Sequence, residues 1–497
     1  MNMAWPWYSR ACATLDTDQS RPKRLCRPRF GPHSFCNRGV LISIVLTFFL
    51  FSGISCGELI FAEDDIQAAL DLADPGDTVM VGPGQYGSVL VDKPLTIIGD
   101  GAKVSARLQE PAIIIESGSV SISGFEVEGV PENPEAKFGY YMGALDRSQS
   151  LEVGHGYRLN LPNAAILIFS DDVTVKEIQV EDAEVGIFVE NACNVSFQNC
   201  TIERCDIGIE LLRCCEGWVD SSHFDKCDKY GLYIEGCDEI SATKNNFVDT
   251  ANAGLLLKRS FNCEVEKNLF SGNRQGLFLW NSSSNLIKEN WADGNLYYGM
   301  VISDESCNNS VIDNLARNNG GSSSFGVGIS IQENSSHNWV ARNVVEKNMN
   351  GLELTKGCEF NLVCCNNASG NSNAIRLDKN QNNLVCRNNF QRNMINAYDN
   401  ASHNFWNGTL GNYYDDYRGH DKDDDGVGDD PYWIPKGSSC AVDLRPLTSP
   451  GPGVFDLDAG KAELLRYAVY RPEEDLPYKV ENDVIKIGTR SPTIWWR

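Results

Sequence analysis

The residues best suited to bind a metal are four aspartates near the C-terminal end of the chain: Asp421, Asp423, Asp425 and Asp429. Carboxylates at alternate positions, followed by Gly426, can wrap one hard cation with oxygen ligands, as a calcium loop does. An EF-hand would have a bidentate Glu where this chain has Tyr432, and Pro431 blocks a following helix. The pattern therefore predicts one structural Ca²⁺ outside a helix–loop–helix hand, with a solvated acidic turn as the alternative.

Cysteines form the second group of reactive side chains. Of 18 in the chain, 14 follow Cys56, and several recur at 22-residue intervals: Cys193, Cys215 and Cys237; Cys205 and Cys227; Cys364 and Cys386. Such pairs predict either disulfides between stacked turns of chain or thiols packed in a core. A soft-metal site is disfavoured because the chain has no Cys-x-x-Cys pair after Cys56 and only 6 His.

Candidate catalytic residues are few. Gly154-His155-Gly156 and Asp171-Asp172 resemble fragments of the pectin-hydrolase site, in which carboxylates flank the bond that is cleaved. Their order along the chain is reversed, and Asp171-Asp172 also fits a turn after an apolar run. The stretch 131–162 interrupts the surrounding pattern and could form a groove beside these residues. We keep His155, Asp171 and Asp172 as catalytic candidates and expect a protein that does not catalyse a reaction.

Aromatic residues offer a different chemistry, because flat rings stack on sugar rings. Six lie in the central and late parts of the chain: Trp280, Trp291, Tyr297, Tyr298, Trp339 and Trp406. Aromatic residues also fill protein cores. The sequence leaves both roles open for each of them.

Composition narrows the possible partners. The 497 residues carry a formal charge of −24, which argues against nucleic acid and anionic lipid, since both need a basic surface. A hydrophobic content of 42% supports a large folded core, and 44 Gly favour turns over long helices.

Repeats determine which elements position these residues. A small residue followed by alternating apolar positions recurs about every 23 residues, at Ala165, Gly186, Gly208, Gly231, Gly254, Gly276, Gly299, Gly328, Gly351, Ala374 and Ala397. One longer step coincides with a loop-like insertion at 319–324. A second series keeps the same phase: Asn199, Ser222, Asn245, Asn268, Asn290, Asn314, Asn343, Asn366 and Asn388. A fixed period with two such series predicts a solenoid.

Each repeat holds runs of only three to five residues rich in β-branched and aromatic types, too short for a helix pair. The coils are therefore strand and turn, stacked at about 4.8 Å, with one buried Asn per coil bonded along the stack. A helical pattern at 64–73 predicts an N-terminal cap, and 447–497 is interpreted as a C-terminal cover.

Residues 1–56 have the layout of an export segment. A long basic stretch precedes the apolar run 40–51 and small residues before Cys56. The apolar run is shorter than the ~20 residues that span a bilayer, although an uncleaved N-terminal anchor remains the alternative. We expect a periplasmic, extracellular or cell-surface protein with no other strong membrane interaction.

Two end motifs identify a family. The stretches 66–69 (IQAA), 76–79 (GDTV), 81–86 (VGPGQY) and 92–99 (DKPLTIIG) resemble the start of NosD-like proteins, and 411–417 (GNYYDDY) with 421–432 resembles their end. The resemblance implies an all-β, single-stranded right-handed parallel β-helix with N-terminal helical and C-terminal caps. The expected parts are 57–110 (cap and first coils), 111–410 (β-helix) and 411–446 (calcium-loop-like motif).

The resemblance also implies carbohydrate-binding or sugar-hydrolase repeats, and some members are associated with copper delivery. We expect an acidic surface protein that binds polysaccharide or envelope components. The alternatives are a polysaccharide hydrolase or lyase with a groove near 131–172, and a copper-related accessory protein. No His/Met/Cys cluster in the sequence presents a copper site.

Overall fold

The computed structural model describes residues 57–62, 64–107, 110–130, 162–321, 325–451, 479–481 and 484–486. Contacts divide the chain into two units, and all described residues belong to the unit Gly57–Lys486. The predicted export segment 1–56 and most of the predicted cover 447–497 lie outside the described residues. No helix among the described residues is long and apolar enough to cross a membrane.

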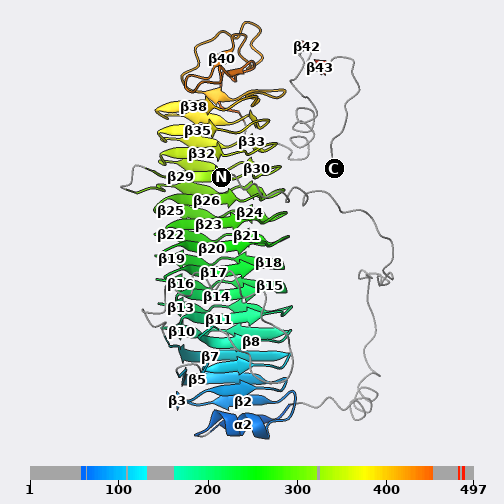
Figure 1. The fold of residues 1–497 in the computed structure, drawn as a ribbon, viewed down its shortest axis with the longest axis vertical. Helices are drawn as coiled ribbons and strands as arrows, with labels where there is room; N and C mark the ends of the chain where they lie inside the picture. Colours follow the sequence, from blue (N-terminus) through cyan, green and yellow to red (C-terminus); the bar gives the residue numbers. More distant parts are fainter. Residues whose placement is uncertain are drawn as a thin grey trace, which may run out of the picture. The chain divides into compact units, whose positions relative to one another are not determined.

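The fold is a parallel β-helix with coils of about 23 residues, which confirms the predicted fold class (Figure 1). Each regular coil contributes one strand to each of three stacks, and every strand pairs in parallel with the equivalent strand of the next coil. We call these the first, second and third stacks, in the order in which the chain visits them.

The first and second stacks join along two long strands, β5 (Thr96–Ser105) and β7 (Val120–Glu128), which run through both. The other strands of the first stack are β1 (Leu59–Ala62), β2 (Thr78–Val81), β9 (Val173–Lys176), β12 (Ser196–Gln198), β15 (Cys215–Asp220), β18 (Asp238–Thr243), β21 (Glu264–Glu266), β24 (Leu286–Lys288), β27 (Ser310–Ile312), β30 (Trp339–Ala341), β33 (Leu362–Cys364) and β36 (Leu384–Cys386). Those of the second stack are β3 (Gly84–Tyr86), β10 (Gln179–Glu181), β13 (Thr201–Glu203), β16 (His223–Asp225), β19 (Asn246–Val248), β22 (Leu269–Ser271), β25 (Trp291–Asp293), β28 (Leu315–Arg317), β31 (Val344–Glu346), β34 (Asn367–Ser369), β37 (Asn389–Gln391) and β39 (Tyr413–Tyr414).

The third stack is a separate 13-stranded sheet. Its strands are β4 (Val89–Val91), β6 (Ile113–Ile115), β8 (Ala164–Ile168), β11 (Val185–Glu190), β14 (Ile207–Leu212), β17 (Tyr230–Glu235), β20 (Ala253–Lys258), β23 (Gln275–Trp280), β26 (Tyr298–Ser303), β29 (Val327–Ile331), β32 (Asn350–Thr355), β35 (Asn373–Asp378) and β38 (Ile395–Asn400).

The recurring glycines lie in the third stack, and close packing explains them. A Cβ on Gly254 would come within 2.9 Å of the carbonyl oxygen of Gly276 and of ring or Cβ atoms of two phenylalanines. Those phenylalanines, Phe247 and Phe270, stack with ring centroids 5.0 Å apart. The repeated Gly thus leaves room for the core, and none of the stacked glycines needs a positive φ.

The predicted asparagine column runs along the corner between the first and second stacks. Asn268 is typical: its backbone N–H and side-chain amide both donate to Oδ1 of Asn290 in the next coil, at 2.9 and 3.0 Å. Ser222 belongs to the column as predicted, but Asn199 does not. Asn199 is exposed at φ 53°, and Cys200 takes the inward position, so that part of the prediction was wrong.

Two further asparagine columns occupy the other corners, and neither was predicted from the sequence. One contains Asn273, Asn295, Asn319, Asn348, Asn371 and Asn393. The other contains Asn285, Asn309, Asn338, Asn361, Asn383 and Asn404. In the later coils, all three corners are therefore held by amide hydrogen bonds that run from coil to coil.

The N-terminal cap is the helix α2 (Ile66–Leu72), within the predicted range. Asp65 accepts a hydrogen bond from the N–H of Ala68 at 3.3 Å, and the helix buries Ile66, Ala69 and Leu70 against the first coil.

At the other end, the antiparallel pair β40 (Tyr432–Trp433) and β41 (Val442–Asp443) follows the last coil, with the ring of Tyr432 stacked 3.7 Å from that of Tyr414. A second antiparallel pair, β42 (Lys479–Glu481) and β43 (Val484–Lys486), lies later in the chain.

Two insertions interrupt the coils at the same corner, between the second and third stacks. One separates β28 from β29 where the sequence predicts it, although 322–324 are outside the described residues. The other separates β7 from β8, and its residues 131–161 are also outside them. Both insertions thus begin and end beside one edge of the third stack.

Candidate functional site

The outer face of the third stack combines aromatic rings, charges and amides. Side chains alternate along each strand, so β23 turns Leu277 and Leu279 into the core and Phe278 and Trp280 outward. We call the outward side chains of β17, β20, β23, β26, β32, β35 and β38 the third face. Its members used below are Tyr233, Glu235, Lys258, Phe278, Trp280, Tyr298, Asn350, Glu353, Asn373, Arg376, Asp378, Tyr398 and Asn400.

An aromatic pair with a nearby cation lies midway along the third face. The rings of Phe278 and Trp280 are 6.1 Å apart and nearly parallel, at 14°. Lys258 Nζ lies 5.4 Å from the centroid of the Trp280 ring. Trp280 is 38% exposed, so part of its ring is accessible to a ligand.

The cation is held by the preceding coil. Lys258 Nζ donates to the hydroxyl of Tyr233 at 3.2 Å and to Glu235 Oε2 at 3.4 Å, and Tyr233 donates to the same carboxylate. Burial, followed by the charge of Glu235, raises the pKa of Tyr233. Burial opposes ionisation of Glu235, but the hydrogen bond from Tyr233 and the Lys258 charge outweigh it and lower its pKa. On β17 and β20, the third face therefore holds Glu235 and Lys258 as a charged pair in a fixed position.

A polar patch follows on the later coils, made of Asn350, Glu353, Asn373, Arg376 and Asp378. Asn373 Nδ2 donates to Asn350 Oδ1 at 2.8 Å, and Asn350 Nδ2 donates to Glu353 Oε1 at 2.9 Å. Arg376 Nε lies 3.8 Å from Glu353 Oε1, and its Nη2 lies 3.4 Å from Asp378 Oδ2.

Aromatic side chains border the polar patch. The Arg376 guanidinium lies 4.6 Å from the centroid of the Tyr398 ring. Tyr298 packs edge-on against Phe325 of the nearby insertion, with centroids 5.3 Å apart. Burial raises the pKa of Glu353, and burial with the Glu353 charge raises that of Tyr298 to about 12. Tyr298 therefore remains a neutral hydroxyl at the edge of the patch.

Three of the four predicted calcium ligands come together. One carboxylate oxygen each from Asp421, Asp423 and Asp425 lies within 4.8 Å of the others. Asp429 is not in this group, and its Oδ2 accepts a hydrogen bond from the N–H of Lys422 at 2.7 Å. Asp421 also accepts from the N–H of Asp425 at 3.2 Å, so the carboxylates help to form the turn. Calcium binding stays a prediction.

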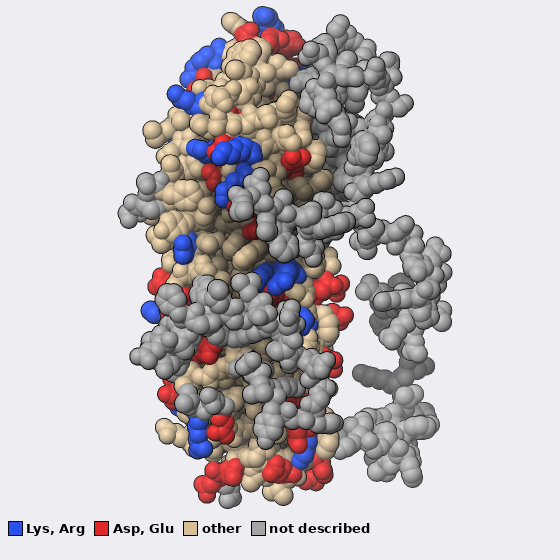
Figure 2. Space-filling model, viewed as in Figure 1, with Lys and Arg blue, Asp and Glu red and all other residues tan. Residues whose placement is uncertain are grey.

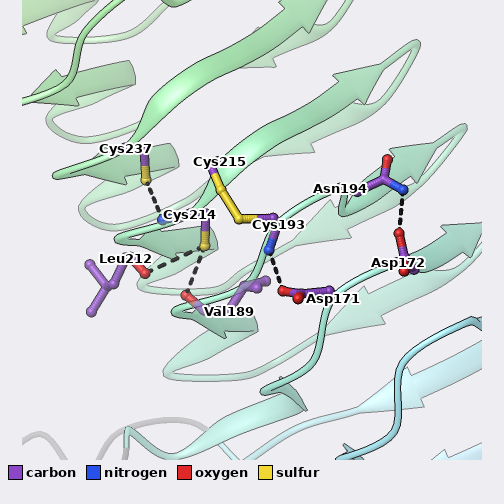
Figure 3. The surroundings of a disulfide bond; sticks show 9 residues. All are labelled: Asp171, Asp172, Val189, Cys193, Asn194, Leu212, Cys214, Cys215 and Cys237. Atoms are coloured by element: carbon purple, nitrogen blue, oxygen red, sulfur yellow. Dashed lines mark hydrogen bonds between the residues drawn. A yellow bond between two sulfur atoms is a disulfide. The ribbon is translucent and has the colours of Figure 1, made fainter. Parts of the chain in front are cut away.

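The candidate catalytic aspartates lie in a turn before β9 (Figure 3). Asp171 Oδ1 accepts from the N–H of Cys193 at 2.7 Å, and Asp172 Oδ1 accepts from Asn194 Nδ2 at 2.5 Å. Both bonds tie the turn to the next coil. His155 lies outside the described residues, so the structure does not bring the three candidates together.

Figure 3 also shows how the cysteines divide into two columns. Cys193 and Cys215 form a disulfide between neighbouring coils, with Cα atoms 4.5 Å apart. Cys237 does not continue that column as predicted, but lies above Cys214, whose N–H donates to its sulfur at 3.2 Å. Cys205, Cys227, Cys364 and Cys386 remain buried thiols. Both predicted alternatives thus occur: one pair forms a disulfide between coils, and the other cysteines named here are thiols packed in the core.

The predicted aromatic residues also divide. Trp280 and Trp291 are 38% and 43% exposed, whereas Trp406 is in the core at 1% and donates to Asp399 at 2.7 Å. Glu353 and Arg376 were not predicted from the sequence. The signal was present, because each is a charged residue at an outward position of a repeat, in Gly351-Leu-Glu-Leu and Ala374-Ile-Arg-Leu.

Three solved structures are similar to parts of this chain, each with a TM-score below 0.5. Dettilon tailspike protein (gp208) is 13% identical with a TM-score of 0.49, covering 64% of this chain and 68% of its own. The Azotobacter vinelandii mannuronan C-5 epimerase AlgE6 A-module is 13% identical with a TM-score of 0.43, covering 69% and 93%. PfbA, a surface adhesin of Streptococcus pneumoniae, is 14% identical with a TM-score of 0.42, covering 64% and 87%. No curated protein matches the chain.

A family model described as periplasmic copper-binding protein (NosD) matches residues 139–319 and 241–419. The described residues do not fit copper. Their one cluster of three candidate ligands offers hard carboxylate oxygens, whereas thiolate and imidazole suit copper better. Burial raises the pKa of the Cys205 and Cys263 thiols to about 12, which disfavours the thiolate form.

The two matches overlap and together cover residues 139–419, more than half of the chain. They extend over the regular coils of all three stacks, including β32 and β35, which carry the polar patch. The chain belongs to the NosD family, whose model is described as periplasmic copper-binding protein.

Proposed function

We propose that this protein binds a polysaccharide or another glycan of the cell envelope along the third face, without cleaving it. The observation that carries the proposal is the open Trp280–Phe278 pair on the same sheet face as the polar patch. Glycan sites need a flat apolar surface for the sugar ring and fixed polar groups for its hydroxyls. The third face supplies both, on strands that the β-helix holds in register.

The shape of the sheet supports a long ligand rather than a small one. Equivalent positions repeat at about 4.8 Å from strand to strand. The aromatic pair on β23 and the polar patch on β32 and β35 are separated by β26 and β29 in the order of the third stack. A chain of several sugar units lying along the stack can touch both regions at once.

The two carboxylates of the polar patch are arranged to form ion pairs with Arg376. Glycoside cleavage needs two carboxyl groups about 5–9.5 Å apart with the scissile bond between them. Glu353 and Asp378 instead share the Arg376 guanidinium, which occupies the space between them. Their positions therefore favour binding over hydrolysis.

Trp280→Ala tests the proposal against a matched control. Trp218, on the outer face of the first stack, has the same 38% exposure, so Trp218→Ala removes an equal ring from another face. On a glycan array, Trp280→Ala should lose at least about tenfold in affinity for the bound glycan, equivalent to about 1.4 kcal/mol. Trp218→Ala should bind as the parent does.

Reducing-end release on the same glycans separates binding from cleavage. We expect no release above that of the heat-treated protein. No binding to any glycan would overturn the proposal, and release that Glu353→Gln abolishes would replace it with hydrolysis.

A further inference from the structure

The charges on the third stack show a consistent pattern. Its strands contain two cations, Lys258 and Arg376. They also contain five outward carboxylates: Glu190, Glu210, Glu235, Glu353 and Asp378. Both cations are already paired, Lys258 with Glu235 at 3.4 Å and Arg376 with Glu353 and Asp378 at 3.8 and 3.4 Å.

We propose that the third face selects a polymer of uncharged sugars and rejects polymers that carry carboxylate or phosphate groups. The proposal rests on the glycan binding proposed above and specifies its ligand. An anionic sugar would have to displace a protein carboxylate from Arg376 or Lys258 before it gained a partner of its own. Because such an exchange gains no net ion pair and costs the displaced carboxylate one of its cationic partners, it is unfavourable.

The negative electrostatic potential of the whole chain also disfavours anionic polymers. The formal charge is −24, and a polyanion approaching the rod is repelled before contact, within a Debye length of about 10 Å at moderate salt. Figure 2 shows acidic side chains gathered at the end of the rod that carries α2, where Glu58, Asp64, Asp65, Asp71 and Asp74 are exposed. An uncharged polymer does not experience this repulsion.

The polar patch is suited to hydroxyl groups. The amides of Asn350 and Asn373 are only 3% and 8% exposed, so the half-buried Asn400 amide beside them is the one that can offer donors and an acceptor to a sugar hydroxyl. Asn400 Nδ2 donates to Asp378 Oδ1 at 3.0 Å and extends the network to the next coil. The patch thus presents groups that pair with hydroxyls without needing a charge on the ligand.

The test compares a β-linked mannan with polymannuronate, which share ring and linkage and differ in whether the exocyclic carbon is an alcohol or a carboxylate. Calorimetry at constant ionic strength should show mannan binding to the parent protein at least about tenfold tighter than polymannuronate. The double variant Glu353→Gln with Asp378→Asn leaves Arg376 without a carboxylate partner. It keeps the acceptors for Asn350 and Asn400, so the fold should be retained.

In this variant, the ratio of the polymannuronate affinity to the mannan affinity should rise at least about tenfold. The matched control is Asp313→Asn, which frees Arg342 from a 2.6 Å ion pair away from the third stack. It should leave both affinities unchanged.

Three results would overturn the proposal: equal binding of both polymers by the parent, a double variant with unchanged preference, or a gain of the same size in the control. Binding of neither polymer, together with no binding on the glycan array, would instead overturn the proposed function. A protein that binds mannan on the array but fails the charge comparison keeps its function and loses this specificity.

Discussion

Residue types repeat from coil to coil at the corners of the β-helix, whereas they vary on its third face. At the corner between the first and second stacks, seven successive coils from Asn245 to Asn388 place the same residue type at one position. On the third face, the outward position that is Phe278 in one coil is Glu353 or Arg376 in later ones. At the buried corners, each coil must supply hydrogen-bond partners for the next coil. On the outer face, the side chains of each coil can differ from those of its neighbours. Repetition therefore indicates structure, and departures from it indicate function.

Removal of one corner amide should have the largest effect on stability. Asn290 accepts from Asn268 and donates to Asn314 Oδ1 and the Val265 carbonyl. Asn290→Ala leaves several buried partners unsatisfied, so we expect a loss of about 3–5 kcal/mol in the free energy of unfolding, measured with denaturant. Thr201→Ala, on the outer side of β13, should cost less than about 0.5 kcal/mol. Equal effects would contradict the distinction between corner and surface.

The end of this column should make stability depend on pH. Asn412 passes its hydrogen bonds to Asp443, and burial raises the pKa of Asp443 to about 7 from 3.8. A raised carboxyl pKa means that the folded state holds the proton more tightly than the unfolded state. Stability from this group is therefore complete below about pH 4 and declines as pH rises through about 7, by up to about 4 kcal/mol.

Thermal unfolding between pH 5 and pH 8 checks this expectation. Asp443→Asn keeps an acceptor for Asn412 and should flatten the pH dependence. A parent protein whose melting temperature rises steadily from pH 5 to pH 8 would show that Asp443 is ionised throughout.

The glycine column should show a smaller effect. Gly254→Ala places a Cβ 2.9 Å from three heavy atoms, and overpacking of this kind costs about 1–3 kcal/mol. Gly82→Ala is the control, because a Cβ there meets nothing within 4 Å and the φ is not positive. If both variants unfold at the same denaturant concentration, close packing does not explain the column.

Calcium should have the smallest effect, at the acidic loop beyond the last coil. We expect calorimetry to detect one site and the melting temperature to rise by a few degrees at saturating Ca²⁺, since a ligand bound only by the folded state stabilises it. Replacing Asp421, Asp423 and Asp425 with Asn should remove both effects. Absence of heat and of any shift in the parent would favour a solvated acidic turn.

Much of the fold could be predicted because, in a solenoid, the period of the sequence repeat equals the length of one coil. The steps between glycines located the third stack, and the late asparagines located one corner. Prediction failed where two polar residues are adjacent in a turn. In Asn308-Asn309 and Asn318-Asn319, the first residue is exposed at positive φ and the second is buried in a column. Asn199 and Cys200 make the same pair, which is why Asn199 was misplaced.

The sequence by itself determined the coil length, the strand-and-turn character and the family, because each depends on residue types at fixed spacing. Only the tertiary structure decided which neighbour in a turn faces inward and which side chains meet across coils. Glu353, Arg376 and Asp378 join because β32 and β35 lie side by side in register. Contacts of this kind depend on the stacking of strands about 4.8 Å apart, a distance that the linear order of residues does not record.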